Sequence, residues 1–167
     1  AEIGRHDYKN CVVFHSLSKH SNLPGIRSGF VAGDANLLKP YLQYRTYHGA
    51  AMRVQHQLAS IVAWNDEVHV EENRQLYRAK FDLFQHELGH LLALKKPDAG
   101  FYYWLNVDDD EKFAQMLMEK AHIKVLPGRY LSRQTETGNP GENHVRMALV
   151  ADIAQCEQAI ARLKHIL

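Results

Sequence analysis

Few cysteines and no long apolar segment occur in this sequence of 167 residues. The two cysteines, Cys11 and Cys156, lack the close spacing of metal-binding pairs, which favours structural thiols in a reducing compartment such as the cytoplasm. The apolar runs are only a few residues long, too short for a membrane-spanning helix. The first residues, "AEIGRHDYKN", are polar and charged, unlike a secretory signal peptide.

Neither sign of charge is in excess. The sequence has 20 Lys and Arg against 19 Asp and Glu, a formal net charge of +1, with no dense basic block. This pattern gives no reason to expect nucleic acid as a partner. Hydrophobic residues make up 46% of the chain and charged residues 23%, which suits one packed domain, or a small domain and part of another.

The apolar pattern predicts an α/β arrangement at the start of the chain and an α+β arrangement at its end. Strands are expected from runs of β-branched and aromatic residues at 11–17, 29–34, 100–107, 123–127 and 144–150. Helices are expected at 35–48, 52–65, 66–95, 108–121 and 151–167. The second of these helices is apolar enough to be buried, and the third joins the two parts.

One short stretch, "HELGH" from His86 to His90, matches a zinc motif. An α-helix advances about 100° per residue, so His86 and His90 lie about 180° and 220° from Tyr77 on the 66–95 helix. We therefore expect both histidines to face solvent, away from the walled cleft that a catalytic zinc needs. The opposite stripe, which must face the core, consists of Tyr77, Phe81, Phe84, Leu88, Leu91 and Leu92.

The extended form of the zinc motif is also incomplete. It needs Gly and His at positions where this chain has Ala93 and Lys96, although spacing alone leaves a distant Glu ligand open. We expect a solvated helix face and no metal site here. A zinc hydrolase is the least favoured alternative.

A second stretch, "FHSLSKHSNLPGIRSGFVAGD" (14–34), carries a stronger chemical signal. A predicted strand delivers Lys19 into a loop, with Ser16 and Ser18 just before it and Arg27 after it. Hydroxyls and a guanidinium can cradle a phosphate, because arginine binds two phosphate oxygens at once. A lysine beside such a site, in a partly desolvated pocket, can act as a Schiff-base nucleophile. On composition alone, Lys19 and Arg27 would be ordinary solvated side chains.

The pattern S-x-S-K, a short loop and R-x-G closely resembles the cofactor-lysine segment of the fold-type I aminotransferases, the class I/II group that uses pyridoxal 5′-phosphate. The resemblance implies that Lys19 is the catalytic Schiff-base lysine and that Ser16, Ser18 and Arg27 bind the cofactor phosphate. It also implies the fold class: α/β, with the C-terminal portion of a large domain followed by an α+β small domain whose short sheet is packed by helices.

Further segments extend this resemblance. "HVRMALV" looks like the late strand whose arginine binds the substrate α-carboxylate in two parallel bonds, which would make Arg146 substrate-binding. Without the resemblance, a structural role for Arg146 would be as good an interpretation as a substrate-binding role. "HVEENRQLYRAKFD" and "PDAGFYYWLNV" look like the connecting helix and the first small-domain strand. The implied domains are a piece of the large domain (1–50), connecting helices (51–95) and the small domain (96–167).

Within the family, "SLSKHSNLPGIRSGFVAGD", "YRTYHGAAM" and "VLPGRYLSR" are most similar to succinyldiaminopimelate aminotransferases of bacterial lysine biosynthesis. The implied protein is a cytoplasmic homodimer that moves amino groups between amino acids and 2-oxo acids, with no nucleic-acid or membrane partner. Tyr47 and His48 would lie near the neighbouring subunit's active site, or be ordinary packing residues. Another class I/II aminotransferase with a different substrate, or an inactive C-terminal fragment, are the alternatives.

The resemblance covers the C-terminal part of a family member, less than half of its length. We therefore expect the residues that contact the pyridine ring to precede residue 1. They are an Asp opposite the ring nitrogen, a stacking aromatic residue, and an Asn and a Tyr near the ring hydroxyl. Substrate side-chain specificity would depend largely on the same missing half and on a second subunit.

Overall fold

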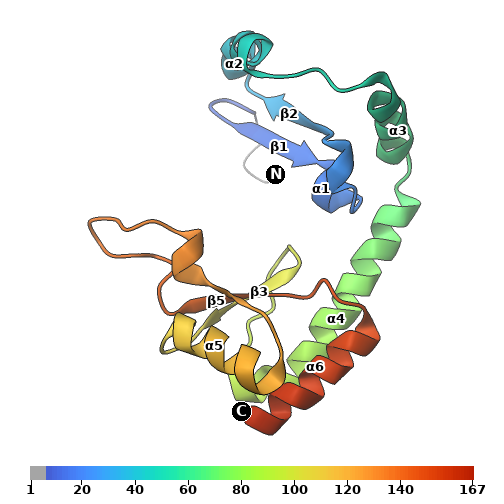
Figure 1. Cartoon of the computed structure of the whole chain (residues 1–167). Coiled ribbons are helices and arrows are strands. Elements are labelled where there is room, and N and C mark those ends of the chain that lie inside the picture. The colour runs from blue at the N-terminus through green and yellow to red at the C-terminus, as the bar shows by residue number, and fades with distance from the viewer. Residues whose placement is uncertain (1–6) are drawn as a thin grey trace. The chain divides into compact units, whose positions relative to one another are not determined.

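The computed structural model describes residues 7–167 (Figure 1). The chain forms two compact units, Ala1–Arg74 and Gln75–Leu167. The boundary between them falls inside the longest helix, α4 (Val68–Leu92). Within the described range, no helix combines the length and the apolar character that a membrane crossing requires.

The first unit is built on a pair of antiparallel strands followed by two helices. Strands β1 and β2 pair in register from Val12 opposite Gly33 to Ser16 opposite Gly29. Asp34 caps the helix after β2 by accepting a hydrogen bond from the Asn36 N–H at 2.8 Å, as its position in the sequence predicts. The elements are β1 (Val12–Ser16), α1 (Leu17–His20), the 3₁₀ helix η2 (Pro24–Ile26), β2 (Gly29–Gly33), α2 (Ala35–His48) and α3 (Val54–Asn65).

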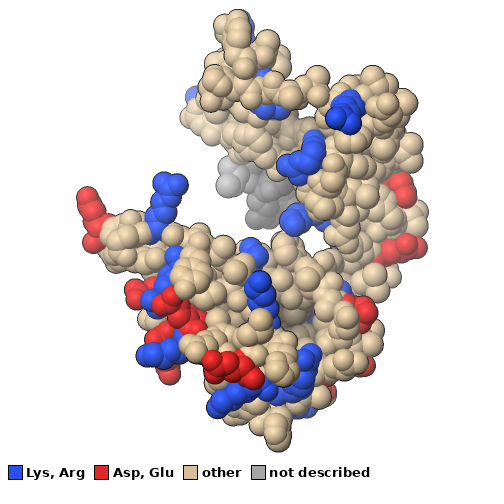
Figure 2. All heavy atoms as spheres, in the orientation of Figure 1, with Lys and Arg blue, Asp and Glu red and all other residues tan. Residues whose placement is uncertain are grey.

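Helix α3 is less buried than the sequence predicts. Only Ser60 and Ala63 are buried, whereas four apolar residues are more than half exposed: Val54, Leu58, Ile61 and Val62. A helix that is apolar all round must be covered on several sides, whereas in the first unit α3 packs mainly against α1 and η2. In Figure 2, few charged side chains interrupt this unit around α2 and α3, whereas charges of both signs are interspersed on the second unit.

The second unit contains a three-stranded antiparallel sheet in the order β3-β5-β4. All the strands and helices predicted for this part of the chain are present, although β4 has only the last two of the five residues predicted for it, Leu126 and Pro127. The elements after α4 are β3 (Tyr102–Asn106), α5 (Asp110–Ala121), β4 (Leu126–Pro127), the 3₁₀ helix η3 (Gly128–Leu131), β5 (His144–Ala148) and α6 (Ile153–Ile166).

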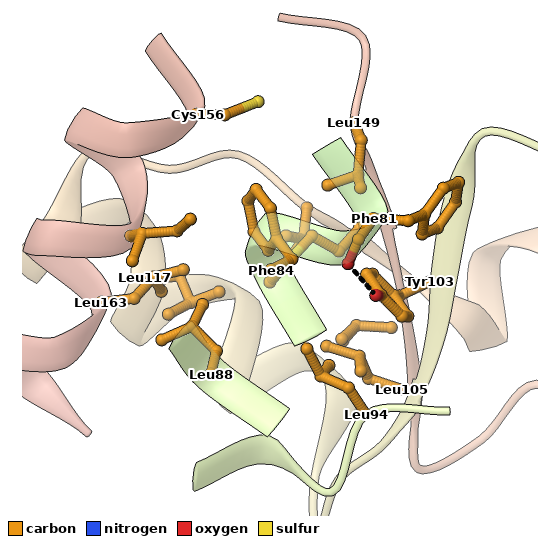
Figure 3. Packing of buried hydrophobic residues seen from close by; sticks show 14 residues of the cluster. Phe81, Phe84, Leu88, Leu94, Tyr103, Leu105, Leu117, Leu149, Cys156 and Leu163 are labelled. Carbon is orange, nitrogen blue, oxygen red and sulfur yellow. Dashed lines mark hydrogen bonds between the residues drawn. The ribbon is translucent and has the colours of Figure 1, made fainter. Parts of the chain in front are cut away.

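The core of the second unit lies between this sheet and helices α4, α5 and α6 (Figure 3). The predicted stripe of α4 faces it through Phe81, Phe84 and Leu88, all buried. The Tyr103 hydroxyl, fully buried, donates a hydrogen bond to the Phe81 carbonyl at 3.1 Å. Leu91, from the same stripe, is 42% exposed, so the prediction that it faces the core is wrong. A helical wheel gives the direction of a side chain but does not show whether another element covers it.

A buried ion pair fixes the start of α5 to η3. Asp110 is 0% exposed, and its Oδ1 accepts hydrogen bonds from Arg129 Nε and Nη2 at 2.8 and 2.6 Å. Its Oδ2 accepts one from the Arg129 backbone N–H at 3.1 Å. Burial by itself raises the pKa of this carboxyl, but the hydrogen bonds from Arg129 outweigh it and lower the pKa to about 2.

Candidate active site

The residues predicted to hold the cofactor lie on the connection between β1 and β2. Ser16 ends β1 and caps the single turn of α1, where its hydroxyl accepts a hydrogen bond from the Ser18 N–H at 3.2 Å. The Ser16 Oγ also lies 3.0 Å from the Ser18 hydroxyl and 3.0 Å from the Ser28 carbonyl oxygen. Lys19 follows on the same turn, with an exposed side chain. Two hydroxyls and one amine are therefore held on one short turn.

Arg27 lies on the other arm of the connection, where its guanidinium donates a hydrogen bond to the Pro24 carbonyl at 3.0 Å. The Leu17 N–H donates to the Ser28 carbonyl at 3.1 Å, and Ser16 stands opposite Gly29 in the strand pair. The residue before Ser28 is therefore held close to the start of α1. Arg27 has left-handed backbone angles (φ 59°, ψ 32°), which cost about 1 kcal/mol for a residue other than glycine. Strain of this kind concentrates at functional sites.

The donor set of this loop fits pyridoxal 5′-phosphate. A phosphate dianion needs hydrogen-bond donors and positive charge, which two neighbouring hydroxyls and a guanidinium supply. The cofactor aldehyde needs an accessible amine, which Lys19 supplies. The structure thus brings Ser16, Ser18, Lys19 and Arg27 onto one loop.

Ser28 contributes to this loop and is not singled out by its sequence, because a serine in a loop is commonplace. Its side chain is buried, its carbonyl accepts the Leu17 N–H, and its hydroxyl accepts a hydrogen bond from Trp64 Nε1 at 3.2 Å. A serine that follows the left-handed Arg27 and precedes a strand could only be recognised once the strand register is known.

Arg146 lies in the second unit, on β5. Its guanidinium is 5.7 Å from the centre of the Tyr102 ring. Its Nε is shielded from solvent and has no hydrogen-bond partner within residues 7–167. An unpaired buried donor costs about 1 to 3 kcal/mol, more when charged, which makes the Arg146 Nε a candidate donor to a ligand.

The "HELGH" stretch has a geometry unlike that of a zinc site. His86 and His90 are exposed, as the helical wheel predicts. Glu87 forms an ion pair with Lys164 and lies 2.8 Å from His86 Nδ1, and these two hydrogen bonds lower the pKa of its carboxyl. Nowhere in the described range do three or more His, Cys, Asp or Glu gather in a way that could hold a metal ion.

Tyr47 and His48, in the last turn of α2, are both exposed. The His48 ring stacks on Tyr44 with 4.3 Å between ring centres. Their placement beside a neighbouring subunit's active site stays a prediction.

Comparison with known proteins agrees on one class, the aminotransferases. Residues 3–163 match the family model of aminotransferase class I and II. A crystal structure of an aminotransferase from Neisseria meningitidis is 53% identical, with a TM-score of 0.87 over 99% of this chain and 43% of that chain. A probable aminotransferase of Mycobacterium tuberculosis is 30% identical over 158 residues (94% of this chain, 36% of the relative). An LL-diaminopimelate aminotransferase of Nitratidesulfovibrio vulgaris is 30% identical over 161 residues (93% and 40%).

The chain belongs to the class I and II aminotransferase family, whose members depend on pyridoxal 5′-phosphate. The predicted family and the predicted mixed fold are both confirmed. The chain spans about two fifths of the length of these relatives. The finer resemblance to succinyldiaminopimelate aminotransferases stays a prediction.

Proposed function

We propose that the whole protein is an aminotransferase that moves an amino group between an amino acid and a 2-oxo acid. The observation that carries the proposal is the β1–β2 connection, where Lys19 shares one turn with Ser16 and Ser18 and Arg27 lies on the opposite arm. Membership of the class I and II family supports this interpretation of the loop.

Each residue of the loop has a defined task in this proposal. Ser16, Ser18 and Arg27 bind the cofactor phosphate, and Lys19 is the amine to which the cofactor attaches. When bound, pyridoxal 5′-phosphate supplies an electron sink that stabilises negative charge on the substrate α-carbon. After the substrate amine has displaced it from the cofactor, Lys19 Nζ would remove the proton from the substrate α-carbon as general base and would then donate it to C4′ of the cofactor as general acid.

Arg146 binds the substrate α-carboxylate in this proposal. A guanidinium pairs with a carboxylate in two parallel hydrogen bonds, which fixes the orientation of the bond to be broken. The Nε, shielded from solvent and without a hydrogen-bond partner among residues 7–167, and the neighbouring Tyr102 ring support this, because one donor of the guanidinium stays available to a ligand.

We expect Arg146→Ala to lower kcat/KM for the amino acid by roughly 10²- to 10³-fold, because two charge-assisted hydrogen bonds are lost. Binding of pyridoxal 5′-phosphate should be unchanged, because none of the residues proposed to bind the cofactor lies in the second unit. Steady-state kinetics and cofactor titration of the full-length protein measure the two effects. Arg133→Ala, which removes an exposed arginine elsewhere in the second unit, is the matched control. A loss below about fivefold, or equal losses in both variants, would refute the assignment.

For the substrate, we propose succinyldiaminopimelate as amino donor, with a 2-oxo acid as acceptor. The support is the likeness of three segments, "SLSKHSNLPGIRSGFVAGD", "YRTYHGAAM" and "VLPGRYLSR", to enzymes with that substrate. Relatives named LL-diaminopimelate aminotransferases make the unsuccinylated compound the direct competitor.

The test of activity and substrate is amino-group transfer by the full-length protein with each compound in turn. We expect kcat/KM to be at least about tenfold higher for the succinylated donor, a difference of about 1.4 kcal/mol in transition-state binding. A preference for the unsuccinylated donor would replace the proposed substrate. Absence of transfer with any amino acid would refute the proposed activity.

We also propose that the whole protein is a cytoplasmic homodimer. Support comes from apolar side chains of the first unit that are more than half exposed, namely Leu42, Tyr44, Tyr47, Val54, Leu58, Ile61 and Val62. Exposed apolar surface of this extent is typical of protein–protein interfaces. The 167-residue chain alone, at about two fifths of its relatives' length, is the alternative case of a folded but inactive fragment.

A further inference from the structure

Four aromatic rings form a cluster beside the β1–β2 connection, and none of them has a part in the proposed chemistry. Trp64, from α3, lies at its centre. The centre of its ring is 5.6 Å from that of His15, 5.2 Å from that of His20 and 5.3 Å from that of Phe30. Because the other three rings come from β1, α1 and β2, this one side chain contacts every element that surrounds the loop.

The contact between Trp64 and His20 fixes the turn that carries Lys19. His20 is the next residue after Lys19 in α1, and its side chain is only 8% exposed. Its Nδ1 lies 3.0 Å from the Ser21 hydroxyl, and the His15 ring packs on it edge to face at 5.0 Å. Burial first, and His15 second, lower the pKa of His20, so a neutral ring packs on the indole at pH 7.

The indole N–H of Trp64 reaches the opposite arm of the loop. It donates to the Ser28 hydroxyl at 3.2 Å. Ser28 directly follows Arg27, and its carbonyl binds the Leu17 N–H. One side chain therefore contacts the neighbour of the proposed Schiff-base lysine with its ring face and the neighbour of the proposed phosphate ligand with its N–H.

We infer that Trp64 is a positioning residue of the cofactor site. Its ring holds the Lys19 turn through His20, and its N–H holds the Arg27 segment through Ser28. The two contacts fix the Lys19 turn relative to the backbone of Arg27. From these two positions the amine and the guanidinium must reach the aldehyde and the phosphate of the cofactor. The inference rests on the proposed function, because it assigns Trp64 to the same loop.

The inference is tested by comparing pyridoxal 5′-phosphate with pyridoxal, which lacks the phosphate. Trp64→Phe keeps an aromatic ring against His20 but removes the N–H that binds Ser28. In the full-length protein, it should raise the dissociation constant of pyridoxal 5′-phosphate about fivefold to tenfold, as expected for one hydrogen bond. Binding of pyridoxal should change less than about twofold, because only the phosphate arm has moved. Visible absorption of the bound compound measures both.

Ser28→Ala, which removes the same hydrogen bond from its other side, provides an independent variant. The double variant should be no weaker than either single variant, since the hydrogen bond can be lost only once. Gln55→Ala, an exposed position on α3, is the control for unspecific effects on that helix. Circular dichroism of each variant establishes that it is folded, and Ser28→Ala decides the question if Trp64→Phe is not.

The outcomes separate this inference from the function on which it rests. Borohydride trapping that labels Lys19 in the unaltered protein, with the selective loss of phosphate-dependent affinity in both variants, supports the inference. Equal losses for both compounds, additive effects in the double variant, or no loss at all overturn it and leave the aminotransferase proposal standing. Absence of a Lys19 adduct in the unaltered protein instead overturns the proposed function.

Discussion

Lys19→Ala is expected to abolish amino-group transfer by the full-length protein, with kcat reduced by at least about 10³-fold. Positioned proton transfer alone contributes about 10²- to 10⁴-fold to enzymatic rates, and Lys19 is proposed both to move the α-carbon proton and to attach the cofactor. Lys19→Arg should be equally inactive, because arginine keeps the positive charge but has no titratable amine. Lys39→Ala, on the exposed surface of α2, should retain full activity.

The same residue can be identified chemically without an activity assay. Borohydride reduction in the presence of pyridoxal 5′-phosphate should leave a pyridoxyl group on Lys19 and on no other lysine, as read by peptide mass spectrometry. Labelling of the full-length protein but not of the 167-residue chain would show that the chain carries the lysine without the complete pocket. Substantial turnover by Lys19→Ala, or an adduct on another lysine, would exclude Lys19 as the cofactor residue.

The local part of this site could be predicted from the sequence because its residues are neighbours in the chain. Ser16 ends an apolar strand, and Ser18 and Lys19 follow within three residues, so any turn at that point keeps them together. Arg27 could be placed only by resemblance, because its approach depends on the pairing of Ser16 with Gly29. Trp64 was not anticipated at all, since contacts between α3 and the loop are tertiary and leave no periodic signal.

Features of the fold that depend on neighbouring residues could be predicted from the sequence, whereas features that depend on tertiary contacts could not. Helix α2 has the predicted bounds, 35–48, and Asp34 caps its first turn. The prediction that α3 is buried is wrong. An apolar sequence indicates that a helix must pack against other elements, but it does not show which elements cover it. The ion pair of Asp110 with Arg129 leaves no signal in the sequence, because the two residues come from separate elements, α5 and η3.

The most destabilising of the proposed substitutions is expected at Asp110. Both carboxylate oxygens accept hydrogen bonds, Oδ1 from the Arg129 side chain and Oδ2 from the Arg129 backbone N–H. Asp110→Asn keeps the shape but turns one acceptor into a donor that faces another donor, and it removes the buried charge. Breaking a buried pair costs about 3 to 5 kcal/mol. We expect Asp110→Asn to lower the free energy of unfolding by about 3 kcal/mol, the lower end of this range. Arg129 is 28% exposed and keeps its ion pair with Glu111 at 2.9 Å, so its charge is not left unpaired.

Urea unfolding of the 167-residue chain measures this loss. The chain has two tryptophans, so in a Trp64→Phe background the fluorescence of Trp104 reports on the second unit alone. Two neighbouring aspartates provide graded controls. Asp108→Asn, at an exposed position, should change the free energy of unfolding by less than about 0.5 kcal/mol. Asp109→Ala removes the cap of α5 and should cost about 1 kcal/mol. If Asp110→Asn lowers the free energy of unfolding by no more than Asp109→Ala does, the expectation is contradicted.

The dependence of stability on pH distinguishes the ion pair from a mere packing effect. The pKa of Asp110 is lowered from its ordinary 3.8 to about 2 in the folded protein, so the folded state binds the proton less readily than the unfolded state. Its stabilisation is therefore fully present above about pH 4 and is lost as the pH falls towards 2. Asp110→Asn has no carboxyl to titrate and should lack this part of the decline. The difference in unfolding free energy between the two proteins should thus narrow between about pH 4 and pH 2, whereas a packing defect would keep it constant.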